Sequence, residues 1–368
     1  MTYLLAVSVV LLAFANGAND NFKGVATLWG AGRTSYGRAL TWATAFTMMG
    51  SLTAVWLAAG LAAKFNGSKL LPADVYTQVP FLAAVALGAA ATVLLASRLG
   101  MPVSTTHALT GGLAGAGIAA AGLSQVNFSA LAGSVAAPLL FSPVVALLLT
   151  AGLYSWTGRL DVVATREENG NRDCLCVDEP ELALLPAGAS ASVAVLAPPS
   201  VRWASSVECQ TGAEAVRVSA EDAVHWFSAA AISFARGLND TPKIAALFLA
   251  ASAASVTLHF GVVAAAMALG GILGAARVAQ TMSKEITPMA TSEAVSANLV
   301  AAGLVTLASF WALPVSTTHV TSGAILGIGV RRRGEANWPR VRQILLSWVV
   351  TLPLGAALAA ILYVLLAG

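Results

Sequence analysis

Two polar motifs each occur twice in this chain, and this repetition constrains the fold more than any other feature. The first copies are FANGANDNFKGVA at 14–26 and PVSTTH at 102–107. The second copies are FARGLNDTPKIAA at 234–246 and PVSTTH at 314–319. The longer segments share seven of thirteen residues, and the hexapeptides are identical. The same pair of motifs in both halves predicts two related structural repeats in one chain.

The composition places these repeats in a lipid bilayer. Apolar residues make up 57% of the chain and charged residues only 10%, whereas soluble domains contain about 25% charged residues. Stretches of about 20 apolar residues, enough to cross roughly 30 Å of hydrocarbon, lie at 39–63, 80–98, 128–156, 254–276, 289–312 and 342–367. Further apolar helices hold the motifs, at 2–30, 102–122, 223–250 and 315–330. We expect an all-α polytopic membrane protein with discontinuous helices and about ten to twelve transmembrane segments. The N-terminal stretch is expected to be the first of them, rather than a removed signal peptide.

A polar insert separates the two membrane halves. Residues 157–221 contain 5 basic and 10 acidic side chains, a net charge of −5, whereas the rest of the chain has a net charge of +8. The insert is rich in Pro, Ser and Gly, which favours a soluble segment. Two short runs in it, SVAVLA and AVRVSA, are typical of strands. We therefore expect a first membrane repeat at 1–156, an acidic insert at 157–221 and a second membrane repeat at 222–368.

Arginine residues indicate how the halves are oriented. The loop after the second hexapeptide helix, RRRGEANWPRVR at 331–342, carries five arginines and should face the cytoplasm by the positive-inside rule. The equivalent loop of the first half, AAAGLSQVNFS at 119–129, carries no charge. Equivalent loops on opposite faces define inverted-topology repeats. This orientation places the insert in the cytoplasm and the C-terminus outside. A parallel repeat, with both loops in the cytoplasm, is the alternative.

All the cysteines of the chain lie in the insert, at Cys174, Cys176 and Cys209. A tetrahedral metal site would need a fourth ligand, and the insert contains no histidine. We expect reduced loop thiols and no structural metal, which agrees with a cytoplasmic insert.

Two aspartates, Asp20 and Asp240, lie inside apolar segments, and each follows an asparagine, Asn19 or Asn239. A charged side chain at membrane depth costs at least roughly 2.5–3.5 kcal/mol, so it normally faces a partner or a polar cavity. Carboxylate and amide oxygens are suitable ligands for a sodium ion, and a carboxylate also accepts a proton. This pattern predicts a coupling-ion or proton site in each half.

The residues around each aspartate suggest two structures. Gly17 and Gly237 precede the Asn-Asp pairs, and we expect them to let the helix unwind and expose backbone carbonyls. Lys23 and Lys243 follow three residues after the aspartates. On a continuous helix this spacing places both groups on one face. The alternative is therefore that each aspartate forms an ion pair with its lysine.

The hexapeptides predict an anion site. Proline suits the first turn of a helix, and the hydroxyls that follow can cap its free N–H groups. Helix N-termini with hydroxyl donors bind oxyanions, whereas plain N-capping is the simpler interpretation. His107 and His319 would orient the hydroxyls, titrate, or lie in the core. The candidate hydroxyls are Ser104, Thr105, Thr106, Ser316, Thr317 and Thr318.

With these motifs the chain resembles the inorganic phosphate transporter (PiT) family of ion-coupled phosphate symporters. The likeness rests on the Gly-x-Asn-Asp segments and the PVSTTH pair, and it covers both membrane halves. It implies an all-helical inverted-repeat fold, a homodimer, a cytoplasmic central loop and phosphate bound between the halves. Carried over residue by residue, it implies that phosphate is contacted by Asp20, Ser104, Thr105, Thr106, Asp240, Ser316, Thr317 and Thr318.

The chain departs from the family at two equivalent positions. The family usually continues Asn-Asp-Val-Ala-Asn, and the resemblance assigns the last Asn to the coupling-cation site. Lys23 and Lys243 stand there instead. A tethered ammonium can replace a sodium ion but cannot be transported. This disfavours sodium coupling through these positions and favours proton coupling through a lysine, an aspartate or Glu293. Alternatively, both lysines bind the oxyanion, or both extend to the membrane interface.

These observations predict a secondary active transporter that imports phosphate by symport with a proton or sodium. Sulfate or arsenate is the alternative cargo, and a non-transporting phosphate sensor is a further alternative. The aspartates favour phosphate over sulfate because phosphate can donate a hydrogen bond to a carboxylate. No nucleotide-binding loop, HExxH motif or nucleophile elbow is found in the sequence, so we do not expect an enzyme. We expect no cofactor and no nucleic acid, and a location in the plasma (inner) membrane of a prokaryote.

Overall fold

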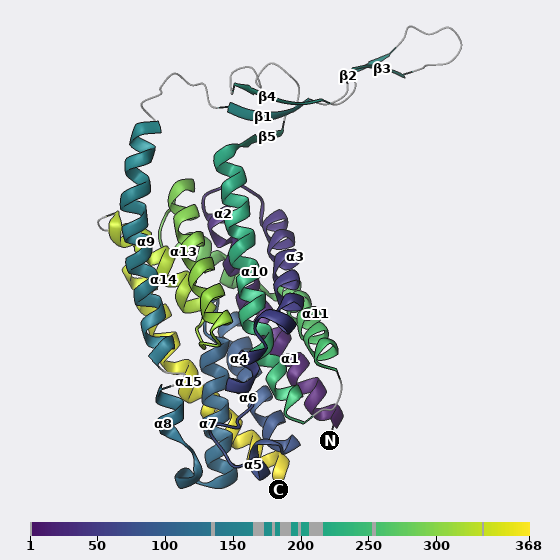
Figure 1. Cartoon of the computed structure of the whole chain (residues 1–368), viewed down its shortest axis with the longest axis vertical. Helices are drawn as coiled ribbons and strands as arrows, with labels where there is room; N and C mark the ends of the chain where they lie inside the picture. Colours follow the sequence, from purple (N-terminus) through teal and green to yellow (C-terminus); the bar gives the residue numbers. More distant parts are fainter. Residues whose placement is uncertain are drawn as a thin grey trace. The chain divides into compact units, whose positions relative to one another are not determined.

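A computed structural model describes residues 2–133, 137–164, 173–178, 181–184, 193–197, 200–205, 216–251, 255–332 and 335–368. The chain divides into two compact units (Figure 1). The membrane unit comprises Met1–Ser155 together with Ser228–Gly368, and the smaller unit comprises Trp156–Phe227. The membrane unit is built from helices, and all the described strands lie in the smaller unit.

The helices of the membrane unit follow the apolar segments of the sequence. The first half contains α1 (Thr2–Asp20), a 3₁₀ helix (Asn21–Val25), α2 (Ala26–Gly30), α3 (Tyr36–Leu57), α4 (Ala59–Phe65), α5 (Ala73–Tyr76), α6 (Val79–Arg98), α7 (Thr105–Ala121), a 3₁₀ turn (Leu123–Gln125), α8 (Phe128–Leu131) and α9 (Ala137–Ala164). The second half contains α10 (Ala220–Leu249), α11 (Val256–Gly274), α12 (Ala276–Gln280), a π-helical turn (Thr281–Glu285), α13 (Thr291–Phe310), α14 (Thr317–Arg331) and α15 (Trp338–Ala367).

Within the described residues, six helical segments are long and apolar enough to cross a membrane. They are Tyr3–Gly30, Tyr36–Leu57, Val79–Arg98, Val256–Gly274, Thr291–Phe310 and Trp338–Ala367. The chain is therefore a helical membrane protein, as its composition predicts. The long α10 falls outside this set, and its sequence contains both acidic and basic side chains.

Glycines hold the helices of the membrane unit close together. A Cβ atom on Gly17 would lie 1.9 Å from the carbonyl oxygen of Met267 in α11, and one on Gly237 would lie 2.1 Å from that of Thr47 in α3. Neither contact leaves room for a side chain. The prediction that these glycines unwind their helices is wrong for Gly237, because α10 continues through the whole motif. In the first half α1 continues through Gly17 but ends at Asp20, where a 3₁₀ helix follows. Small residues here let neighbouring backbones approach, which is how membrane helices pack.

The same contacts occur in both halves. Gly270 of α11 would place a Cβ atom 1.9 Å from the carbonyl oxygen of Phe14, and Gly50 of α3 would place one 2.0 Å from that of Phe234. Phe14 and Phe234 begin the two aligned motifs. The packing of α1 on α11 therefore matches the packing of α10 on α3, with the partners exchanged between the halves.

The hexapeptide helices also pack through glycines. A Cβ atom on Gly111 of α7 would lie 2.1 Å from the Leu352 carbonyl oxygen of α15, and one on Gly323 of α14 would lie 2.3 Å from the Pro143 carbonyl oxygen of α9. Each hexapeptide helix thus lies against a long helix that contains a proline, Pro143 or Pro353.

The two loops that differ in charge lie at different ends of the membrane unit. The Asn337 N–H, in the arginine-rich loop before α15, donates to the Ile286 carbonyl (2.8 Å). The uncharged loop after α7 contacts the segment between α4 and α6, since the Asn127 N–H donates to the Leu70 carbonyl (3.0 Å). The far end of α15 approaches the same segment, because Tyr363 Oη lies 3.4 Å from Gln78 Oε1. The 30 residues of α15 span about 45 Å, so they separate the two loops.

The smaller unit contains five described strands. β1 (Asp173–Asp178) pairs antiparallel with β4 (Ser200–Ser205) and β5 (Val216–Ser219), and β2 (Glu181–Leu184) pairs antiparallel with β3 (Val193–Ala197). The two predicted strands are confirmed as β3 and β5. The expectation of loop cysteines is wrong for Cys174 and Cys176, which lie on β1, a strand paired on both edges. Cys209 lies outside the described residues.

Candidate functional site

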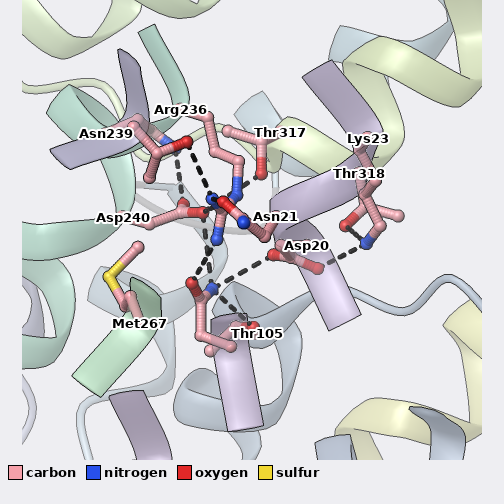
Figure 2. A network of polar contacts seen from close by, with 12 residues as sticks. Asp20, Asn21, Lys23, Thr105, Arg236, Asn239, Asp240, Met267, Thr317 and Thr318 are labelled. Carbon is pink, nitrogen blue, oxygen red and sulfur yellow. Dashed lines mark hydrogen bonds and ion pairs between the residues drawn. The ribbon is translucent and has the colours of Figure 1, made fainter. Parts of the chain in front are cut away.

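The polar motifs of the two halves meet in one buried cluster (Figure 2). Its side chains come from the end of α1 and the 3₁₀ helix after it, from the middle of α10, and from the N-terminal turns of α7 and α14. All eight predicted substrate residues are at most 4% exposed. They are Asp20, Ser104, Thr105, Thr106, Asp240, Ser316, Thr317 and Thr318.

In the first half, Lys23 forms an ion pair with Asp20. The Lys23 Nζ also donates to Asn19 Oδ1 (2.8 Å), to the Val103 carbonyl (3.1 Å) and to Thr318 Oγ1 (2.6 Å). The predicted alternative, an aspartate paired with the lysine three residues on, is confirmed here. Lys23 therefore connects α1 to the hexapeptides of both halves.

In the second half, Lys243 makes the equivalent contacts. Its Nζ lies 3.6 Å from Asp240 Oδ1 and donates to the Val315 carbonyl (2.6 Å) and to Thr106 Oγ1 (3.0 Å). Each lysine thus contacts the carbonyl before the serine of its own half's hexapeptide and a threonine of the other half. With 1% and 2% exposure for Lys23 and Lys243, the interpretation that they extend to the membrane interface is wrong, because acceptors inside the protein hold both ammonium groups.

The serines of the hexapeptides cap their helices. Ser104 Oγ accepts from the His107 N–H (3.1 Å), and Ser316 Oγ accepts from the His319 N–H (3.2 Å). The N-capping interpretation is therefore confirmed for both serines. Each cap satisfies one free donor at the start of α7 or α14 and holds the threonines of the next turn towards the cluster.

The first threonine of each hexapeptide contacts the acidic part of the cluster. Thr105 Oγ1 accepts from Asn16 Nδ2 (3.0 Å), and Thr317 Oγ1 donates to Asp240 Oδ2 (3.3 Å). Together with the lysine contacts of the next residues, Thr106 and Thr318, these bonds bring four hydroxyls from two helix N-termini into one polar region.

The asparagines of the two motifs tie each aspartate segment to its hexapeptide or to the chain just before it. Asn19 Nδ2 donates to Ser97 Oγ and to the Met101 carbonyl, both at 3.0 Å. Asn239 Nδ2 donates to the Val315 carbonyl (3.3 Å), and its Oδ1 accepts from Ser309 Oγ (3.3 Å). The asparagines therefore fix how α1 and α10 sit against the hexapeptides.

Sequence reasoning missed one charged residue of the cluster, Arg236. It is 1% exposed. Its Nη2 donates to Asn16 Oδ1 (2.8 Å), and its Nη1 donates to Asn21 Oδ1 (3.1 Å) and Thr47 Oγ1 (3.2 Å). The sequence could have pointed to Arg236 as a member of the cluster, because Arg236 and Asn16 occupy the same position of the repeat, four residues before the aspartate. One helical turn puts both on the face that carries the aspartates.

Glu293, a predicted proton-carrying candidate, has other partners. Its Oε1 lies 2.6 Å from Arg332 Nε, and its Oε2 accepts from the Ala290 N–H (2.7 Å) at the start of α13. These contacts join α13 to the end of α14 rather than to the aspartates.

A cavity of about 760 Å³ lies beside the hexapeptide helices. His107 and His319, whose rings are 4.5 Å apart, line it together with Trp348 and mostly apolar side chains. None of the eight predicted substrate residues lines it. In this structure the polar groups of the Asp–Lys cluster form hydrogen bonds and ion pairs with one another and do not line this cavity.

A charged cluster between the two halves of a helical membrane protein is typical of membrane transporters. The sequence pattern of the phosphate transporter family matches residues 16–359. The chain belongs to the phosphate transporter family.

Known relatives are similar over almost the whole chain. A protein of Bacillus subtilis (strain 168) is 28% identical over 377 residues, which cover 100% of this chain and 97% of the relative. A protein of Mycobacterium tuberculosis (strain ATCC 25618 / H37Rv) is 28% identical, covering 98% of this chain and 76% of the relative. Each is named "Probable low-affinity inorganic phosphate transporter". These names describe transporters, not enzymes.

A solved structure shares the fold. It is named "The sodium-dependent phosphate transporter" and is 19% identical to this chain, with a TM-score of 0.69. The likeness covers 100% of this chain and 98% of the solved one.

Proposed function

We propose that this protein is a secondary active transporter that imports inorganic phosphate, bound between the two halves of the membrane unit. The observation that carries the proposal is the buried cluster, in which segments from both halves present lysines, an arginine, threonine hydroxyls and helix N-termini. Such groups bind oxyanions in buried sites that exclude bulk water. Family membership and the names of the relatives support the same function.

The two aspartates favour phosphate as the anion. A protonated phosphate oxygen can donate a hydrogen bond to Asp20 or Asp240, whereas sulfate at neutral pH offers acceptors only. Arsenate shares the protonation chemistry of phosphate, so we expect it to compete, whereas sulfate should compete poorly.

We propose a proton as the coupled cation. Lys23 and Lys243 already provide each aspartate with a positive partner, so no bound sodium is needed to balance the carboxylates. A proton can pass between a carboxylate and an amine within such a pair, whereas the ammonium itself stays attached to the chain. Sodium remains the alternative, and Glu293 is a less favoured proton carrier because Arg332 holds it.

Purified protein in liposomes tests this function. Labelled phosphate should enter under an inward proton gradient without sodium, and unlabelled arsenate should reduce uptake more than sulfate does. Liposomes without protein and a proton-conducting ionophore serve as controls. Uptake that requires a sodium gradient and ignores the proton gradient would contradict the coupling, and binding without uptake under any gradient would instead favour a sensor.

We further propose that the halves are inverted repeats. Two features support this: the equivalent loops lie at opposite ends of α15, and α1 begins at the end of the membrane unit towards which α10 runs (Figure 1). The arginine-rich loop would face the cytoplasm, as would the insert. The C-terminus and the loop after α7 would face outward. Following the family resemblance, we also propose that the protein is a homodimer in the inner membrane of a prokaryote.

Cysteine labelling tests this topology. In a variant without the native cysteines, we expect Ser124→Cys to react with an impermeant thiol reagent in intact cells. Asn337→Cys should react only after the membrane is permeabilised, because its loop is expected inside. Both positions are exposed, so failure to react would not come from burial. Labelling of both in intact cells would contradict the inverted arrangement.

A further inference from the structure

The charges of the buried cluster do not balance. Lys23 contacts Asp20, and Lys243 lies 3.6 Å from Asp240. Each of these pairs has a net charge of zero whether its proton sits on the amine or on the carboxylate. Arg236 is the remaining charged member, and a guanidinium stays protonated in proteins. The cluster therefore carries one positive charge more than its acids can neutralise.

Arg236 also has an unsatisfied donor. Its Nε has no hydrogen-bond partner among the described residues. The nearest acid atom, Asp240 Oδ2, lies 3.8 Å away, too far for a hydrogen bond. The side chain is 1% exposed. Its ion pair with Asp240 is shared with Lys243, so the buried guanidinium has no acid of its own, which is costly. The hydrogen bonds of its guanidinium go to neutral partners: Asn16, Asn21 and Thr47.

The positive charge of Arg236 has no equivalent in the first half of the chain. The equivalent residue of the first half is the neutral Asn16. Its amide nitrogen lies within 3.1 Å of Asp20 Oδ2, 3.0 Å of Thr105 Oγ1 and 3.4 Å of Asp240 Oδ2. Asn16 therefore bridges the acids of both halves, whereas Arg236 brings a positive charge to the same region from α10 (Figure 2).

We propose that Arg236 binds the transported anion directly and supplies the net positive charge that attracts it. This inference rests on the proposed function. When phosphate enters, the guanidinium exchanges its neutral amide and hydroxyl partners for two phosphate oxygens, and Nε becomes one of the two donors. A planar guanidinium fork matches a tetrahedral oxyanion, and charge-assisted bonds exceed neutral ones in strength.

A purely structural role is the competing explanation, because the bonds of Arg236 tie α10 to α1 and α3. To separate the two roles, phosphate affinity is compared among variants that are equally well folded. The full-length protein in detergent is titrated with inorganic phosphate by calorimetry, and its unfolding temperature is measured without phosphate. Arg236→Asn copies the first half, Arg236→Lys keeps the charge, and Arg277→Asn removes an arginine that bonds the Arg98 carbonyl instead.

Arg236→Asn should weaken phosphate binding about 10- to 150-fold, the loss expected for a hydrogen bond to a charged ligand. Arg236→Lys should recover part of this loss, because it keeps the charge but not the guanidinium fork. Arg277→Asn should bind like the wild type. If Arg236→Asn does not fold, Arg236→Gln, which retains an amide donor, takes its place in the comparison.

Wild-type affinity in a folded Arg236→Asn or Arg236→Gln protein would overturn the inference alone. An equal loss in Arg236→Lys and Arg236→Asn would overturn its second part, that Arg236 supplies the charge that attracts the anion. The second result would mean that geometry, not charge, is what the residue supplies. If the wild type takes up no phosphate and binds none, the proposed function fails with the inference.

Discussion

Asp20→Asn and Asp240→Asn should each abolish phosphate uptake in liposomes. Each substitution keeps the size of the side chain but removes the carboxylate that accepts a proton or a phosphate hydrogen bond. It also leaves a buried lysine without its acid. Removing one partner of a buried pair destabilises by about 3–5 kcal/mol, so the unfolding temperature should fall as well.

A second pair of variants separates transport from stability. Asp20→Asn combined with Lys23→Gln removes the whole ion pair, as does Asp240→Asn combined with Lys243→Gln. These double variants should regain part of the lost stability because no buried charge is left unpaired, yet uptake should stay absent. Asp74→Asn, an exposed acid in α5, is the matched control and should transport normally. Near-normal uptake by either single variant would make the carboxylates structural.

Lys23→Asn combined with Lys243→Asn should make the protein bind sodium. The double variant leaves two buried carboxylates without their ammonium partners, beside amide oxygens that suit a hard cation. We expect sodium chloride, compared with choline chloride, to raise the unfolding temperature of the double variant and to leave the wild type unchanged. A ligand at a hundred times its Kd stabilises by about 2.7 kcal/mol, an effect visible in a thermal scan. Uptake should either become sodium-dependent or be lost.

Another lysine pair provides the control. Lys64 and Lys69 lie outside the cluster in and after α4, so Lys64→Asn with Lys69→Asn should change neither sodium response nor uptake. Steep sodium dependence in the wild type that survives the Lys23 and Lys243 substitutions would show that these lysines lie outside the ion site.

The repeated motifs allowed much of the site to be predicted. Two copies of Asn-Asp and two of PVSTTH indicated which residues form the site in each half, and the family resemblance implied that phosphate lies between the halves. The ion pairs were an alternative suggested by the spacing of three residues between Asp20 and Lys23. The serine caps were the simpler alternative to an anion site, suggested by Ser104 and Ser316 preceding a helix.

Other features needed three-dimensional information. The contact of Lys23 with Thr318 joins residues of different halves, and sequence spacing says nothing of such a contact. Gly17 is compatible with either an unwound helix or a close crossing, and only the position of Met267 decides between them. Arg236 was missed because its importance lies in the mismatch with Asn16, whereas the repeat draws attention to the residues that match.

The four glycines at the crossings of α1 with α11 and of α10 with α3 also determine the dimensions of the site. Each occupies a place where one additional carbon atom would overlap a neighbouring backbone oxygen. A methyl group at any of them would push α1 away from α11, or α10 away from α3. The place of each acid in the membrane unit thus depends on atoms that the chain omits, at glycines that offer no side chain to the cargo.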